Sequence, residues 1–173
     1  MSSAVASGRI DLEFTARRPR SPKVHWQRLI TEPLWLAVPS DHGLASRRRV
    51  ALAEAVDEDF VMLHSGWELR SRSEELCAAA GFVPTVAFEG DDLAMVRGFV
   101  AAGLGVSIVP APPGAADSWS GRERLVGISD AGASRDVGPA WSRERRLLPA
   151  AQLFRQHVLE SGLQTLFSDV LAQ

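Results

Sequence analysis

Two short polar stretches carry residue types that could bind a small anion. HSGW, at residues 64–67, follows the apolar run FVML, and EGDD, at residues 89–92, follows TVAF. Each stretch precedes a segment with helical spacing of apolar residues, so each predicts a strand-to-helix junction. The N-terminus of a helix presents free N–H groups and the positive end of its dipole, which favour an anionic ligand.

The first junction has the better chemistry for such a ligand. Ser65 offers a hydroxyl, Gly66 exposes the backbone, and Trp67 provides a flat apolar surface next to His64. In open α/β sheets, ligands bind beyond the carboxyl ends of the strands, where such junctions meet. We therefore predict a small-molecule site at residues 64–67, with Gly90 of the second junction beside it.

Ordinary helix capping explains part of both junctions. Ser65 or Gly66 is the predicted N-cap of the first helix, and Asp91 or Asp92 is the predicted N-cap of the second. Asp91 is the weaker candidate for ligand contact, because an acid at the mouth of the site would repel an anion.

No residue pattern predicts catalysis, a metal site or a cofactor. No two of the four histidines stand four residues apart, and HExxH, CxxC and GxSxG are all missing from the sequence. Gly103 and Gly105 follow a predicted helix rather than a strand, which is the wrong context for a dinucleotide-binding loop. The paired carboxylates and the run of three arginines at residues 47–49 are better explained as caps and solvated surface.

Composition limits the class of protein. The chain has 173 residues, of which 46% are hydrophobic, so it can bury a core. Its formal net charge of -2 gives no electrostatic reason to expect nucleic-acid binding by this chain. No apolar run has membrane-spanning length and no secretory signal is recognisable. Cys77 is the only cysteine, which fits a cytoplasmic protein.

The middle of the chain alternates predicted strands and helices. Apolar runs predict strands at residues 34–38, 60–63, 85–88 and 106–109, and a short helix near residues 52–55. Helices are predicted to end at Gly81 and Gly103, and Gly105 is predicted to allow a close backbone approach. This alternation predicts a parallel α/β sheet.

The flanking segments read differently. Strands are predicted at residues 10–15 and 25–30, the second broken by the sequence TEP at residues 31–33. Two more strands are predicted at residues 125–128 and 137–141, and Pro139 places the latter at an edge or a bulge. Residues 148–171 predict one helix, or two broken near Gly162.

Five stretches stand in a fixed order between about residues 8 and 158. They are GRIDLEF, EPLWLAVPSDHGLA, DFVMLHSGWELR, VAFEGDDLAMVRGFVAAGLGVSIVP and VGPAWSRERRLLPAAQLFRQHV. In this order the chain resembles the effector-binding part of a LysR-type transcriptional regulator. The resemblance implies an α/β fold like type 2 periplasmic binding proteins, with a largely parallel sheet and flanking helices. It further implies a partial first lobe at residues 1–33, a complete second lobe at 34–142, and a return segment at 143–173.

The resemblance also implies a function and a set of contacts. Such domains bind a small metabolite, often an organic acid, between two lobes and are not enzymes. The implied effector-binding residues are Thr15, His64, Ser65, Gly66, Trp67, Gly90, Val109 and Pro110, with no cofactor. His64 and Trp67 are bulkier than the residues common at that position, so the resemblance does not name the effector.

The sequence departs from the family pattern at its N-terminal side. The helix-turn-helix, the linker helix and the opening elements of the first lobe have no counterpart in the sequence. Operator DNA is therefore an expected partner only of a full-length protein, which is also the expected homo-oligomer. Two alternatives stay open: a stand-alone small-molecule binding module of the same fold, and a small α/β enzyme, against which the missing base–nucleophile pair counts.

Overall fold

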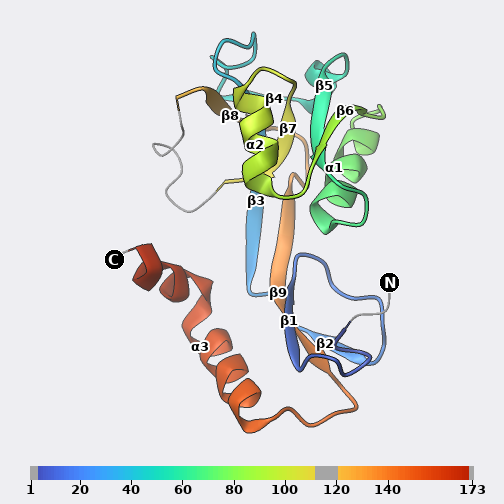
Figure 1. Ribbon diagram of the computed structural model, residues 1–173, viewed down its shortest axis with the longest axis vertical. Helices are drawn as coiled ribbons and strands as arrows, with labels where there is room; N and C mark the ends of the chain where they lie inside the picture. Colours follow the sequence, from blue (N-terminus) through green and yellow to red (C-terminus); the bar gives the residue numbers. More distant parts are fainter. Residues whose placement is uncertain (1–3, 112–120, 172–173) are drawn as a thin grey trace. The chain divides into compact units, whose positions relative to one another are not determined.

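The computed structural model describes residues 4–111 and 121–171 (Figure 1). Two compact units form: a central unit of residues Glu32–Arg135, and a terminal unit of Met1–Thr31 with Asp136–Gln173. The elements, in chain order, are β1 (Leu12–Thr15), β2 (Val24–Trp26), β3 (Ile30–Pro39), β4 (Arg49–Val50), η1 (Leu52–Ala55), β5 (Asp59–Leu63), α1 (Glu68–Ala79), β6 (Thr85–Gly90), α2 (Leu93–Ala101), β7 (Ser107–Pro110), β8 (Glu123–Ile128), β9 (Ser134–Ser142) and α3 (Pro149–Leu171).

The central unit is built around β3. Strands β7 and β8 pair with it in antiparallel register, with Trp35 opposite both Val109 and Gly127. Strand β4 pairs in parallel with β8, and β5 pairs in parallel with β6. A parallel bridge between Phe60 and Val106 brings β5 beside the start of β7.

The apolar runs of the sequence form the core of this unit. Leu36 and Val38 of β3, Phe60 and Val61 of β5, and Val106 before β7 are fully buried. Helix α2 contacts β5, β6 and β7, while α1 contacts β5 and η1 (Figure 1). Burial on this scale supplies the main stabilising free energy of a domain.

Glycines end both helices as the sequence predicts. Gly81 and Gly103 have φ of 94° and 80°, the left-handed conformation that glycine adopts at a helix end. Gly105 has φ of 147°, and a Cβ there would collide with the Asp59 carbonyl oxygen. The close approach predicted for Gly105 is therefore confirmed, since β7 can follow α2 only if this position has no side chain.

The terminal unit has fewer elements. Strands β1 and β2 both pair antiparallel with β9, with Leu12 and His25 each opposite Trp141. Val5, Val24 and Ala140 form its buried cluster, against which Ala6 and Trp26 pack. Residues 149–171 form one helix, so of the two possibilities the unbroken helix is the one observed.

The prediction of a largely parallel sheet is wrong. Strand β3 runs antiparallel to both β7 and β8, and β9 runs antiparallel to β1 and β2. An apolar run shows that a strand is buried on both faces, but it carries no information on the direction of its neighbours. The structure has mixed pairing, with parallel ladders at β5–β6 and β4–β8.

Two predictions based on proline are also wrong. Strand β3 continues through Pro33, which precedes the first residues paired with β7 and β8, so neither ladder needs its N–H. Pro139 lies in a strand with partners on both sides rather than at an edge. The Pro139 carbonyl accepts the Gln27 N–H at 3.2 Å. Gln27 lies just beyond the end of β2, so the pairing of β2 with β9 does not require a backbone N–H from residue 139.

No helix within the described residues is long and apolar enough to cross a membrane.

Candidate functional site

The first strand-to-helix junction leaves the N-terminus of α1 without a side-chain cap. Strand β5 ends at Leu63 and α1 begins at Glu68. Gly66 has φ of 103°, which turns the chain sharply into the helix. The N-cap is Trp67, whose side chain makes no capping hydrogen bond, so the prediction of Ser65 or Gly66 at this position is wrong. The side chain at the N-cap therefore supplies no acceptor to the first amides of α1.

At the second junction, a side chain of the junction itself caps the N-terminus of the helix. Asp92 is the N-cap of α2 and its carboxylate accepts the Met95 N–H at 2.8 Å, which selects Asp92 from the two predicted candidates. Gly90 ends β6 and is buried, and a Cβ on it would lie 3.0 Å from Cγ2 of Val96. The Gly90 carbonyl accepts the His64 N–H at 3.3 Å, so the two junctions are joined through the backbone.

His64 also joins the junctions through its side chain. Its Nδ1 lies 3.0 Å from Glu89 Oε2, and its Nε2 lies 3.1 Å from Asp91 Oδ1. A carboxylate only accepts hydrogen bonds, so both contacts are hydrogen bonds only when both ring nitrogens carry a proton. The imidazolium form of His64 therefore fits this arrangement, and the ring bridges β6 and the turn before α2.

Arg70 holds the opposite side of Glu89. Its Nη1 donates to Glu89 Oε1 at 2.8 Å and to the Leu63 carbonyl at 3.0 Å, while its Nε donates to Glu74 Oε1 at 2.6 Å. The hydrogen bond from Arg70 first, and then that from His64, lower the pKa of Glu89. Sequence reasoning missed Arg70, although the spacing of four residues to Glu74 was a visible signal for one of its three contacts.

The remaining predicted site residues fall in two places. Val109 is buried and Pro110 half-buried at the end of β7. Since β7 runs parallel to β5, these residues lie at the same edge of the sheet as residues 64–67. The Trp67 side chain is 52% exposed there, which leaves its ring accessible to a ligand.

Thr15 lies in the terminal unit, at the end of β1. Its hydroxyl donates to the Arg17 carbonyl at 2.5 Å and accepts the Arg17 N–H at 3.0 Å. This is a local turn in which the threonine side chain stabilises the backbone two residues on.

The chemistry of the first junction is that of binding rather than catalysis. Residues 4–111 and 121–171 contain no group of three or more His, Cys, Asp or Glu side chains placed to hold a metal ion. Cys77 is buried, and its burial raises the pKa of the thiol to about 11, which keeps it protonated and unreactive. Open helix amides, a hydroxyl and an exposed indole can orient a small polar molecule.

Comparison with known proteins settles the family. The family model described as "LysR substrate binding domain" matches residues 1–162. The chain belongs to the LysR substrate-binding domain family. It is 39% identical over 154 residues to the uncharacterized HTH-type transcriptional regulator YybE of Bacillus subtilis (strain 168), covering 88% of this chain and 51% of that protein. Members of the family are effector domains of regulators and not enzymes.

Solved structures share the fold of this LysR-type domain. The effector-binding domain of QuiR in complex with shikimate is similar with a TM-score of 0.82 and 19% identity, over 93% of this chain and 76% of that chain. The regulatory domain of CcmR from Synechocystis PCC6803, in complex with 2-PG, gives a TM-score of 0.82 and 18% identity, over 92% and 76%. Both are periplasmic-binding-protein-like α/β domains.

The chain spans about half the length of the curated relatives it matches, 51% of YybE and 44% of the transcriptional dual regulator GltC of Bacillus subtilis (strain 168). The matched half is the effector-binding part, as the family model shows.

Proposed function

We propose that this effector-binding domain senses a small organic acid at the N-terminus of α1. The observation that carries the proposal is the contrast between the two junctions. Asp92 caps α2 with its side chain, whereas the Trp67 side chain at the N-cap of α1 supplies no acceptor. An anionic group of a ligand would supply the missing acceptor and gain from the helix dipole.

Each residue of the first junction has a distinct role in this proposal. The carboxylate of the ligand accepts hydrogen bonds from the α1 amides and from the Ser65 hydroxyl. Trp67 covers an apolar part of the ligand, and Val109 and Pro110 bound the site from the end of β7. Gly66 and Gly90 give the backbone its close turn and close packing, and Thr15 stays a predicted contact.

His64 lies against two carboxylates beside the site. Its ring nitrogens are 3.0 Å from Glu89 Oε2 and 3.1 Å from Asp91 Oδ1, so both acids have a side-chain partner within the chain. The neighbours support this ligand class, since QuiR was solved with shikimate, which carries a carboxylate.

The activity of a whole regulator is a further proposal. YybE is named an HTH-type, that is helix-turn-helix, transcriptional regulator. A protein with that architecture would bind operator DNA as a homo-oligomer in the cytoplasm. This chain would be its sensor domain. On the same pattern, residues 34–142 form a complete second lobe, and residues 1–33 and 143–173 belong to a first lobe. The alternative is a stand-alone binding module of the same fold without DNA function.

An immunoblot of the source cells separates these two proposals. A band near the length of YybE, about 300 residues given that 154 residues are 51% of it, supports the DNA-binding regulator. A band at 173 residues supports the stand-alone module.

Ligand binding is tested with a panel of mono-, di- and phosphorylated organic acids, shikimate included, by calorimetry. Ser65→Ala should weaken binding of the acid found about two- to tenfold, the effect of one lost hydrogen bond. Thr15→Ala tests the terminal unit in the same way, and Ser46→Ala, an exposed serine of the central unit, is the control. The proposal fails if no acid binds, or if Ser65→Ala and Thr15→Ala both leave affinity unchanged. Turnover of any ligand would overturn the sensor assignment.

A further inference from the structure

A second group of potential ligand-binding residues lies in the terminal unit. The loop between β1 and β2 and the segment after β9 together carry seven cationic side chains. The two segments are joined by the pairing of Val24 with Ser142 and by the Arg143 N–H, which donates to the Lys23 carbonyl at 2.8 Å. The seven are Arg17, Arg18, Arg20, Lys23, Arg143, Arg145 and Arg146.

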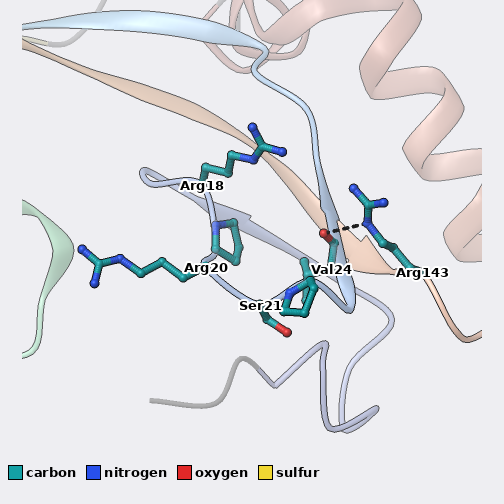
Figure 2. Close-up of a pocket in the computed structure, with 7 residues that line it drawn as sticks. Arg18, Arg20, Ser21, Val24 and Arg143 are labelled. Atoms are coloured by element: carbon teal, nitrogen blue, oxygen red, sulfur yellow. Dashed lines mark hydrogen bonds between the residues drawn. The ribbon is translucent and has the colours of Figure 1, made fainter.

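Three of these cations, Arg18, Arg20 and Arg143, line a surface depression of about 460 Å³ (Figure 2). Its lining residues are Arg18, Pro19, Arg20, Ser21, Pro22, Val24 and Arg143. The lining offers hydrogen-bond donors and positive charge and contains no carboxylate. Two backbone carbonyls of the lining already have donors: that of Val24 accepts the Arg143 Nε–H at 3.3 Å, and that of Ser21 accepts the Val24 N–H at 3.2 Å. The chemistry of the depression therefore selects an anion.

Most of the charge in the depression is not neutralised by the protein. Lys23 is paired with Glu144 at 3.2 Å, but Arg18 and Arg20 are exposed and have no ion pair within the part of the chain that the structure describes. The Ser21 hydroxyl oxygen accepts the Lys23 N–H at 3.3 Å, which leaves its own O–H to donate to a ligand.

The charge of the whole unit points the same way. The terminal unit has ten Lys and Arg against six Asp and Glu, a net charge of +4. The central unit has nine against fifteen, a net charge of -6. An anion is therefore drawn to the terminal unit by long-range attraction as well as by the local donors.

We propose that the depression binds a small polyvalent phosphate-bearing anion. Arginine matches phosphate oxygens with paired N–H donors better than any other side chain. Figure 2 shows the Arg20 side chain extending away from those of Arg18 and Arg143, so the three guanidinium groups do not meet at one point. An anion with two or more charged groups can reach them together, whereas a single phosphate reaches fewer. Pro19 and Pro22 restrict the loop backbone, which lowers the entropy lost on binding.

None of the residues that line this depression is among those proposed for the organic-acid site. Loss of one activity would leave the other in place.

The test is a titration of the full chain with inorganic pyrophosphate and with orthophosphate, followed by backbone amide chemical shifts. Shifts should be confined to residues 16–24 and 142–146, and pyrophosphate should bind more tightly than orthophosphate. The variant Arg18→Gln/Arg20→Gln should lose about fivefold or more in pyrophosphate affinity, the combined effect of two exposed charge contacts. Ser21→Ala, which keeps the charge, should lose about twofold from one donor.

The matched control is Arg9→Gln/Arg28→Gln, which removes the same charge from the same unit at exposed residues that do not line the depression. It should bind pyrophosphate nearly as well as the unchanged protein.

Four results would overturn the proposal. The first is a response reproduced by chloride at equal ionic strength, and the second is equal loss in the control variant. The third is a set of shifts centred on α1, which would assign the phosphate to the organic-acid site. The fourth is a short DNA duplex that competes at a lower phosphate concentration than pyrophosphate, which would make this a nucleic-acid surface.

Discussion

The central and terminal units differ most in how they bury apolar side chains. Among the described residues, 22 form one buried cluster in the central unit, whereas the cluster of the terminal unit consists of Val5, Val24 and Ala140. Both units also expose large apolar side chains, such as Leu153 at 68% in the terminal unit and Val83 at 86% in the central unit, so the difference lies in the buried clusters. Because apolar burial is the main source of stability, the central unit should be the stable half of this chain.

The largest effect is expected from Phe60→Ala in the central unit. Phe60 is fully buried and its ring lies 6.0 Å from that of Phe82, so truncation leaves a cavity. We expect a loss of about 3–5 kcal/mol in the free energy of unfolding, measured by urea denaturation.

Phe154→Ala in α3 is the matched change in the terminal unit. Its ring is half-exposed and makes an edge contact with Phe14 at 6.4 Å. The loss should stay below about 1.5 kcal/mol, the upper range for an aromatic pair of this kind. Equal losses for the two variants would show that the two units do not differ in packing.

The next effect concerns ion pairs. Glu123 is 2% exposed in the central unit, and one of its oxygens accepts from both Nε and Nη2 of Arg97, at 3.0 and 2.8 Å. Arg97→Met leaves a buried carboxylate without this partner and should cost about 3 kcal/mol or slightly more in chemical denaturation.

The exposed pair Lys23–Glu144 of the terminal unit is the comparison. Lys23→Met should cost less than about 1 kcal/mol, because water screens an exposed pair. If Arg97→Met is as mild as Lys23→Met, the burial of Glu123 does not matter for stability.

Amide hydrogen exchange compares the two units without mutation. Amides of β5 and β7 should exchange only when the central unit unfolds almost completely. Amides of β1 and β2 should exchange through a smaller opening that requires less free energy. The difference in opening free energy should be about 2 kcal/mol or more, given the difference in buried side chains. Equal protection in both units would indicate a single cooperative structure.

How much the sequence predicts differs between local and long-range features. In the central unit, periodicity located β5, β6 and β7, and glycine chemistry located the ends of α1 and α2, because these features depend on local geometry. Pro33 in the central unit and Pro139 in the terminal unit were both misinterpreted, since the cost of a missing N–H depends on which neighbouring strand faces it. The direction of β3 was missed for the same reason: strand pairing is a long-range property.

The candidate site was predictable in its location and less so in its contacts. Strand-to-helix junctions can be read from the sequence, and Asp92 acts as the cap that its residue type predicts. The contacts of His64 with Glu89 and Asp91, and of Arg70 with Glu89, join residues 19 to 27 positions apart. No local pattern encodes them, because they depend on the parallel pairing of β5 with β6.

The smallest effect is a pH dependence at Glu89. Hydrogen bonds from Arg70 and then from His64 lower the pKa of Glu89 in the folded chain below its ordinary value of 4.5. Folding therefore favours the carboxylate form, so this contribution to stability is present above pH 4.5 and is lost as the pH falls through the lower folded-state pKa. Glu89→Gln should flatten the acid limb of the stability–pH curve slightly, with the shape of the side chain kept. Asp57→Asn, at an exposed carboxyl group of the same unit, is the control, and if it flattens the curve as much as Glu89→Gln does, the effect comes from net charge and not from the contacts at β6.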